Sequence, residues 1–150
     1  MKENWSENEK KKRYLMSYRW AKKQEERILE EIQTLRMDKM FPSTVNDGMP
    51  KGSEQRDLSD YAAKLDELIQ ELKEERLEKV KRLSDIQKSI KGVENDDEQT
   101  VLRLRYIDGM PWEDICVKIG YSWRQTHRIH SNALKNIKVG ARNENIMDSV

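Results

Sequence analysis

Basic side chains without acidic neighbours are concentrated in one part of the chain, between Ile115 and Asn143. This segment contains no Asp or Glu, whereas acidic and basic residues alternate through the rest of the sequence. Its cationic and imidazole side chains are Lys118, Arg124, His127, Arg128, His130, Lys135, Lys138 and Arg142. A local excess of positive charge attracts phosphate groups even when the whole protein is nearly neutral, as here, with a formal net charge of +1. The pattern therefore predicts a nucleic-acid interface.

Apolar residues at helical spacing predict a helix that begins near Trp123 and ends before Gly140. Ser122 and Gln125 at its start form a capping box, in which the two side chains can satisfy backbone N–H groups reciprocally. The inward face is formed by Thr126, Ile129, Ala133 and Ile137. The outward face carries Trp123, Arg124, His127, Arg128, Ser131 and Lys135. We expect the outward side chains to face the nucleic acid.

A shorter helix is predicted before this one, because Pro111 suits the first helical turn and Gly120 suits a helix end. Two short helices joined by a tight turn are typical of helix-turn-helix proteins, whose second helix enters the major groove of DNA. The guanidinium groups of Arg124 and Arg128 can bind the O6 and N7 atoms of guanine, so we expect them to contact bases. The predicted phosphate-contacting residues are Lys118, Ser122, Gln125, Ser131, Lys135, Lys138 and Arg142.

The chemistry of catalysis and metal binding is not evident in the sequence. His127 and His130 are three residues apart, but no Asp, Glu or Cys completes a metal-ligand set on that face, so both are expected at the surface or facing DNA. Cys116 lies on the predicted inward face of its helix, where a thiol is normally unreactive. No Ser/His/Asp pairing, glycine-rich phosphate loop or carboxylate cluster stands out. We therefore expect no metal site, no cofactor and no enzymatic activity.

Three further features were open to more than one interpretation. Trp112, beside Pro111 at a helix start, is expected to fill the core rather than to stack on a ligand. The indole of Trp123 either contacts a thymine methyl group or folds back onto Tyr121. The basic run at residues 10–13 has acidic neighbours and is expected to form a solvated helix face.

Two long amphipathic helices are predicted in the first part of the chain. Apolar residues recur every three or four positions over residues 5–40 and again from Ser59 to near Gly92. Prolines and glycines interrupt the pattern around residues 41–57, which predicts a loop. Each apolar stripe is too narrow to form a core alone, so a partner helix is required. The partner is either the other helix, in an antiparallel hairpin, or a second copy of the chain in a coiled coil, which would make a homodimer.

The organisation that follows is all-α. Residues 1–92 are expected to form the long helices, and residues 93–140 the helix-turn-helix domain, which opens on an acidic helix start at residues 94–98. Residues 141–150 are expected to be a frayed tail. Valine, isoleucine, threonine and aromatic residues never gather into alternating runs, so strands are not expected.

Composition limits the location of the protein. Charged residues make up 38% of the chain and the mean hydropathy is −1.02, which leaves no apolar stretch long enough to span a membrane. The first residues are rich in Lys and Glu where a secretory signal would have an apolar core. We therefore expect a cytoplasmic protein with no membrane partner.

Several short motifs resemble region 4 of sigma-70 type factors, the part that binds the promoter −35 element. They are Leu-Arg-Leu-Arg-Tyr at 102–106, Trp-Glu-Asp-Ile at 112–115, Gly-Tyr-Ser at 120–122 and Ala-Leu at 133–134. The long charged helical half, the segment Gly-Met-Pro-Lys-Gly-Ser at 48–53 and the run at 121–130 together resemble small prophage-encoded proteins of Gram-positive bacteria that are described as sigma region 4-like.

The resemblance implies base contacts at Trp123, Arg124, His127 and Arg128, and RNA polymerase as a further partner. Sigma factors commonly have Arg-Glu where this chain has Trp123-Arg124, so the preferred DNA sequence should differ from a consensus −35 box. Nothing in the chain resembles region 2, so a complete sigma factor is not expected. The leading hypothesis is a sequence-specific transcription regulator of phage or prophage type. The alternative is a helical protein-interaction module that docks on RNA polymerase or another protein without reading DNA.

Overall fold

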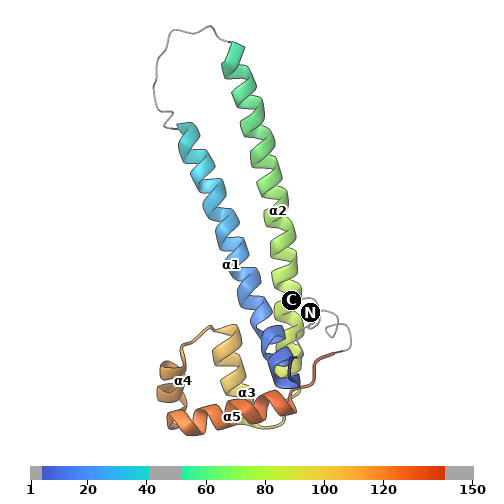
Figure 1. The fold of residues 1–150 in the computed structure, drawn as a ribbon, viewed down its shortest axis with the longest axis vertical. Coiled ribbons are helices and arrows are strands. Elements are labelled where there is room, and N and C mark those ends of the chain that lie inside the picture. The colour runs from blue at the N-terminus through green and yellow to red at the C-terminus, as the bar shows by residue number, and fades with distance from the viewer. Residues whose placement is uncertain (1–4, 41–51, 141–150) are drawn as a thin grey trace. The chain divides into compact units, whose positions relative to one another are not determined.

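The computed structural model describes residues 5–40 and 52–140, and all of its regular elements are helices (Figure 1). They are α1 (Glu7–Met40), α2 (Gly52–Lys91), α3 (Asp96–Leu102), the π-helical turn η1 (Arg103–Ile107), α4 (Trp112–Ile119) and α5 (Trp123–Asn136). No strand occurs in these two ranges, which confirms the predicted all-α fold. None of their helices is long and apolar enough to cross a membrane.

The start of α2 differs from the prediction. The helix begins at Gly52 rather than near Ser59, so the predicted loop was wrong for residues 52–57, and its remainder, 41–51, lies outside the described residues. The early turns of α2 contain Glu54, Gln55 and Arg56, which are good helix formers but carry no apolar stripe. The predicted boundary came too late because it relied on apolar periodicity alone. The predicted tail at 141–150 also lies outside the described residues.

The start of α1 has a capping box that the sequence analysis missed. The Oγ atom of Ser6 accepts a hydrogen bond from the backbone N–H of Glu9 at 3.3 Å. The Glu9 carboxylate accepts one from the backbone N–H of Ser6 at 2.9 Å. The signal was available, because Ser followed three residues later by Glu is the usual sequence of this motif.

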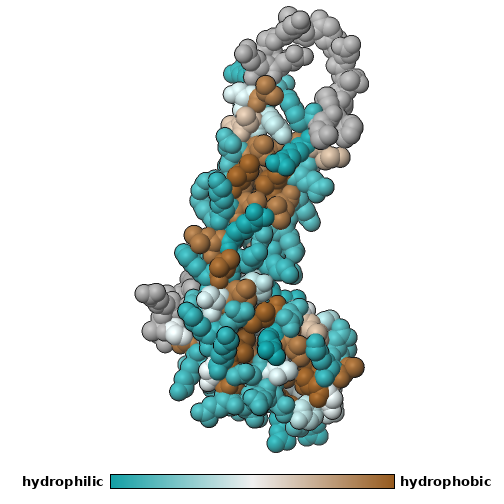
Figure 2. Space-filling view, turned by 180° about the vertical axis from the view of Figure 1, so that it is seen from behind, coloured by the Kyte–Doolittle hydropathy of each residue, from teal (hydrophilic) through white to brown (hydrophobic). Residues whose placement is uncertain are grey.

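The chain divides into two compact units. We call residues 21–78 the hairpin unit, and the remainder, up to Trp20 and from Lys79 onward, the terminal unit. In the hairpin unit α1 and α2 run antiparallel (Figure 1) and share a small core. Its buried residues are Ile28, Ile32, Leu68 and Leu72. Large apolar side chains that stay exposed in this unit are Leu29, Met37, Leu58 and Leu77. Figure 2 shows hydrophobic side chains at the surface of the long helices, among hydrophilic ones.

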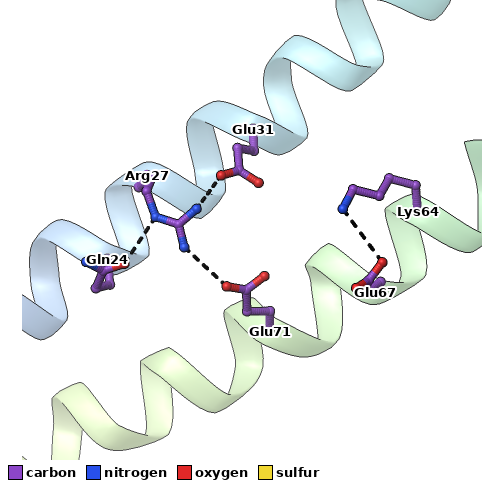
Figure 3. A network of polar contacts seen from close by, with 6 residues as sticks. All are labelled: Gln24, Arg27, Glu31, Lys64, Glu67 and Glu71. Carbon is purple, nitrogen blue, oxygen red and sulfur yellow. Dashed lines mark hydrogen bonds and ion pairs between the residues drawn. The ribbon is translucent and has the colours of Figure 1, made fainter.

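Polar contacts also join the two helices of the hairpin unit. The guanidinium of Arg27 contacts Gln24 and Glu31 on its own helix and Glu71 on α2, the last at 3.2 Å (Figure 3). The charged side chains of this network are each nearly half exposed, so solvent screens their attraction. Packing of the apolar core therefore contributes more to the pairing of these helices than this network does.

The terminal unit has two apolar clusters. One combines the start of α1, the end of α2 and parts of the C-terminal helices, and its buried residues are Tyr14, Leu15, Ile86, Ile90, Val93, Leu102, Tyr106, Ala133, Leu134 and Ile137. The other lies among α3, η1, α4 and α5, and its buried residues are Val101, Leu104, Ile115 and Ile129. The C-terminal helices thus share a core with the ends of both long helices.

Candidate nucleic-acid interface

The connection between α4 and α5 has the geometry of a helix-turn-helix. Gly120 ends α4 in the left-handed conformation, with φ at 73°, and its N–H group donates to the carbonyl of Cys116 at 3.0 Å. Ser122 caps α5, because its Oγ atom accepts a hydrogen bond from the N–H group of Gln125 at 3.2 Å. This bond is one of the two in the predicted capping box. Pro111, the predicted first helical residue, is instead the N-cap of α4, which begins one residue later at Trp112.

The inward face of α5 is the predicted one: Thr126, Ile129, Ala133 and Ile137 are all buried. Of the predicted outward face, Trp123, Arg124, Arg128, Ser131 and Lys135 are exposed, and His127 is half-buried. Within the described residues, no ion pair engages Arg124 or Arg128. Both guanidinium groups are therefore available to an anionic partner, on a helix whose opposite face is fixed by packing.

His127 contacts two indole rings. Its ring centroid is 4.5 Å from that of Trp112 and 4.5 Å from that of Trp123, and both pairs of rings are tilted. The Nε2 atom of His127 is buried and has no hydrogen-bond partner among the described residues. Trp112 also packs beneath the guanidinium of Arg105, at 4.9 Å, and against the buried cluster around Ile115. These ring contacts thus connect the core to Trp123, which is 52% exposed.

The neighbouring Tyr121 is engaged elsewhere. Its hydroxyl donates a hydrogen bond to the carboxylate of Asp97 at 2.9 Å. The Trp123 ring contacts His127 rather than Tyr121, with ring centroids 4.5 Å apart. The other alternative, contact of the exposed indole with a base, stays a prediction.

His130 is buried, which corrects the expectation that it lies at the surface. Only 6% of the residue is exposed, and its Nε2 atom lies 2.7 Å from the hydroxyl of Tyr106. The error arose because the polarity of histidine suggested exposure, whereas Tyr106 supplies a hydrogen-bond partner inside the core. Burial, together with the nearby charge of Lys12 and contributions from His127 and Arg105, lowers the pKa of His130 to about 4. His130 is therefore neutral near pH 7.

The predicted phosphate-contacting residues are mostly at the surface. Lys118, Ser122, Ser131, Lys135 and Lys138 are exposed, and Gln125 is half-buried. Arg142 lies outside the described residues. Lys138 lines a polar hollow whose wall includes Glu98 and Asn136. The Glu98 carboxylate is itself bound by the Nδ2 atom of Asn136, at 2.9 and 3.2 Å. Lys138 thus stands near an acidic group, unlike the cations at the outward face of α5.

Sequence analysis also missed a basic element at this site. The Nζ atom of Lys11, in the first turns of α1, donates to the carbonyl oxygens of Leu134 at 3.0 Å and Lys135 at 3.3 Å. The acidic neighbours of the basic run at residues 10–13 predict a solvated helix face. In the structure Lys11, the second residue of this run, is instead hydrogen-bonded to the last turn of α5. No local pattern reveals a contact between residues 123 positions apart.

Comparison with known proteins identifies one family. The model of the family DUF1492, described as a protein of unknown function, matches residues 38–138, which is more than half of the chain. No curated protein and no solved structure matches the sequence. The matched region includes all of α2 and all of the helix-turn-helix, but not the start of α1.

Proposed function

We propose that this protein, which belongs to the DUF1492 family, is a sequence-specific DNA-binding transcription regulator of phage or prophage type, with α5 as its recognition helix. One observation carries the proposal. Arg124 and Arg128 are exposed, without an ion-pair partner in the described part of the chain, on a helix whose other face is buried. A capped helix after a tight turn, with cations on its free face, suits insertion into a major groove.

The roles of the side chains follow from their surroundings. Arg124 and Arg128 read bases, each through the planar donor fork of its guanidinium group. Trp123 contacts a base through its exposed indole, and His127, packed beneath that ring, holds it in place. Ser131 and Lys135 contact phosphates, which position the protein without selecting a sequence. Loss of one bidentate arginine contact should weaken discrimination by about 1 to 3 kcal/mol.

The resemblance to sigma region 4 supports the same proposal. Its motifs fall on the junction of α3 with η1, on the start of α4, on the turn before α5 and on the buried face of α5. This resemblance makes RNA polymerase a further proposed partner.

A second candidate function is protein interaction through the long helices. The observation that favours it is the exposure of Leu29, Met37, Leu58 and Leu77 on the hairpin unit. Such residues fit a helical partner, either RNA polymerase, another protein, or a second copy of the chain. In this case the helix-turn-helix would not read DNA.

Selection from a pool of random-sequence DNA duplexes separates the two functions. The wild-type protein should enrich a defined sequence, and Arg124→Ala combined with Arg128→Ala should abolish the enrichment while the helical circular-dichroism signal is retained. The matched control is Lys22→Ala combined with Arg36→Ala, which removes two exposed cations from the hairpin unit and should enrich the wild-type sequence. Equal enrichment by the Arg124/Arg128 variant would overturn the proposal, and absence of enrichment by wild type would favour the second function.

A further inference from the structure

The first helix of the chain is fixed against the end of α5. Tyr14 and Leu15 are almost fully buried in the same cluster as Ala133, Leu134 and Ile137. One turn before them, the ammonium group of Lys11 bonds the carbonyls of Leu134 and Lys135, which belong to the C-terminal turn of α5. A cation at this position is favourable because the helix dipole is negative there. The direction of α1 at this point is therefore determined by packing and by hydrogen bonds.

Lys12 follows directly and is exposed. Its charge reaches α5, because it contributes to lowering the pKa of His130. The nearest acidic residue on its own helix, Glu9, is hydrogen-bonded to Ser6 in the capping box and is also attracted by the charge of Lys12, but the two form no ion pair within 4 Å. On α5 itself, Lys135 is exposed in the same last turn whose carbonyls Lys11 binds. Two segments far apart in sequence thus place cations at one end of α5.

We propose that Lys12 binds the sugar-phosphate backbone of duplex DNA together with Lys135, so that the start of α1 forms part of the DNA-binding surface. The inference rests on the proposed function of α5. A recognition helix reads bases mainly with its N-terminal residues, so its other end lies closer to the backbone of the duplex. Lysine suits this position, since it acts on a phosphate as a point charge and needs no exact geometry. The contact adds affinity but no sequence preference.

The test measures binding of the full chain to a mixed-sequence duplex of about 20 bp, or two helical turns, over a range of salt concentrations. Lys12→Ala should weaken binding several-fold at low salt and reduce the log–log salt slope by about 0.9, the value for one phosphate contact. Lys12→Arg should keep the wild-type slope, because it preserves the charge. The matched control is Lys22→Ala, on the same helix but in the hairpin unit, which should leave the slope unchanged.

The outcomes separate this inference from the proposed function. A wild-type slope in Lys12→Ala would overturn the contact of α1 and leave DNA binding by α5 in place. A salt slope reduced equally in Lys12→Arg and in Lys12→Ala would also overturn the contact, since the reduction would then not be caused by the loss of the charge. A wild-type protein that does not bind the duplex, at any salt concentration, would overturn both proposals.

Discussion

The hydroxyl of Tyr106 and the Nε2 atom of His130 share a hydrogen bond of 2.7 Å in the interior of the terminal unit. Their rings are also stacked, with centroids 5.8 Å apart. Because each polar atom satisfies the other, the imidazole of His130 can be buried next to the apolar face of α5. The arrangement requires a neutral imidazole, since a second proton would be placed among Lys12, Arg105 and a low-dielectric core.

Stability should therefore fall in acid. The pKa of His130 is about 4 in the folded protein, against about 6.5 for an ordinary histidine. Between these values the unfolded chain binds more protons, so the free energy of unfolding decreases as the pH falls from about 6.5 towards 4, by roughly 3 kcal/mol over the whole interval. Urea unfolding at a series of pH values measures the slope.

Two variants isolate the contribution of His130. His130→Gln can keep a hydrogen bond to Tyr106 but cannot be protonated, so its slope between about pH 6.5 and 5 should be shallower than that of wild type. Asn132→Ala, at an exposed residue of the same helix, is the matched control and should keep the steep slope. Parallel curves for wild type and His130→Gln would show that the acid sensitivity has another source.

Removing side-chain volume at the start of α1 should disturb α5. Leu15 is 0% exposed, and Leu15→Ala should lower the free energy of unfolding by about 2 to 5 kcal/mol. Its buried neighbours include Ala133 and Leu134, so amide hydrogens of α5 should exchange faster in this variant. The control is Leu77→Ala at a residue 57% exposed, where the expected change is within about 0.5 kcal/mol. If the amide hydrogens of α5 exchange as slowly in Leu15→Ala as in wild type, the shared core of α1 and α5 is contradicted.

The turn of the helix-turn-helix offers a third prediction. Gly120 has φ at 73°, and an added Cβ atom there would meet nothing within 4 Å, so a substitution is penalised only through the backbone. Gly120→Ala should cost about 1 kcal/mol, and Gly120→Asn less, because asparagine tolerates the left-handed region. Thermal unfolding of the two variants provides the comparison. Equal losses would mean that backbone conformation is not what selects glycine here.

A matched glycine shows the effect of a neighbour. Gly109 has a similar φ of 69°, but an added Cβ atom would lie 3.3 Å from the guanidinium of Arg19. Gly109→Ala should therefore cost more than Gly120→Ala, since Arg19 must also move.

Features with a local signal were predictable from the sequence. Ser122 at the start of α5, Gly120 at the end of α4 and the buried face of α5 were found in this way, because caps, left-handed turns and helical periodicity depend on residues only a few positions apart. The start of α2 was missed because its first turns lack the apolar periodicity on which the predicted boundary relied.

Features that depend on distant residues were not predictable. His130 was placed at the surface because its partner Tyr106 is 24 positions away and on another element. The contact of Lys11 with the end of α5 joins residues 123 positions apart, and nothing in the run at residues 10–13 indicates it. The contact of His127 with Trp112 likewise requires α4 and α5 to be packed together. The surroundings of the candidate site therefore depend on contacts between residues far apart in the sequence, which the amino-acid composition of the site does not reveal.

The shared core of α1 and α5 has a consequence for synthesis on the ribosome. Tyr14 and Leu15 leave the exit tunnel long before Ala133 and Leu134 are translated, so the nascent chain must carry them without their partners from α5. Closing a loop of this length is slow compared with forming the local helices. The long helices can form during translation, whereas the helix-turn-helix acquires its final support only after the last turn of α5 has emerged.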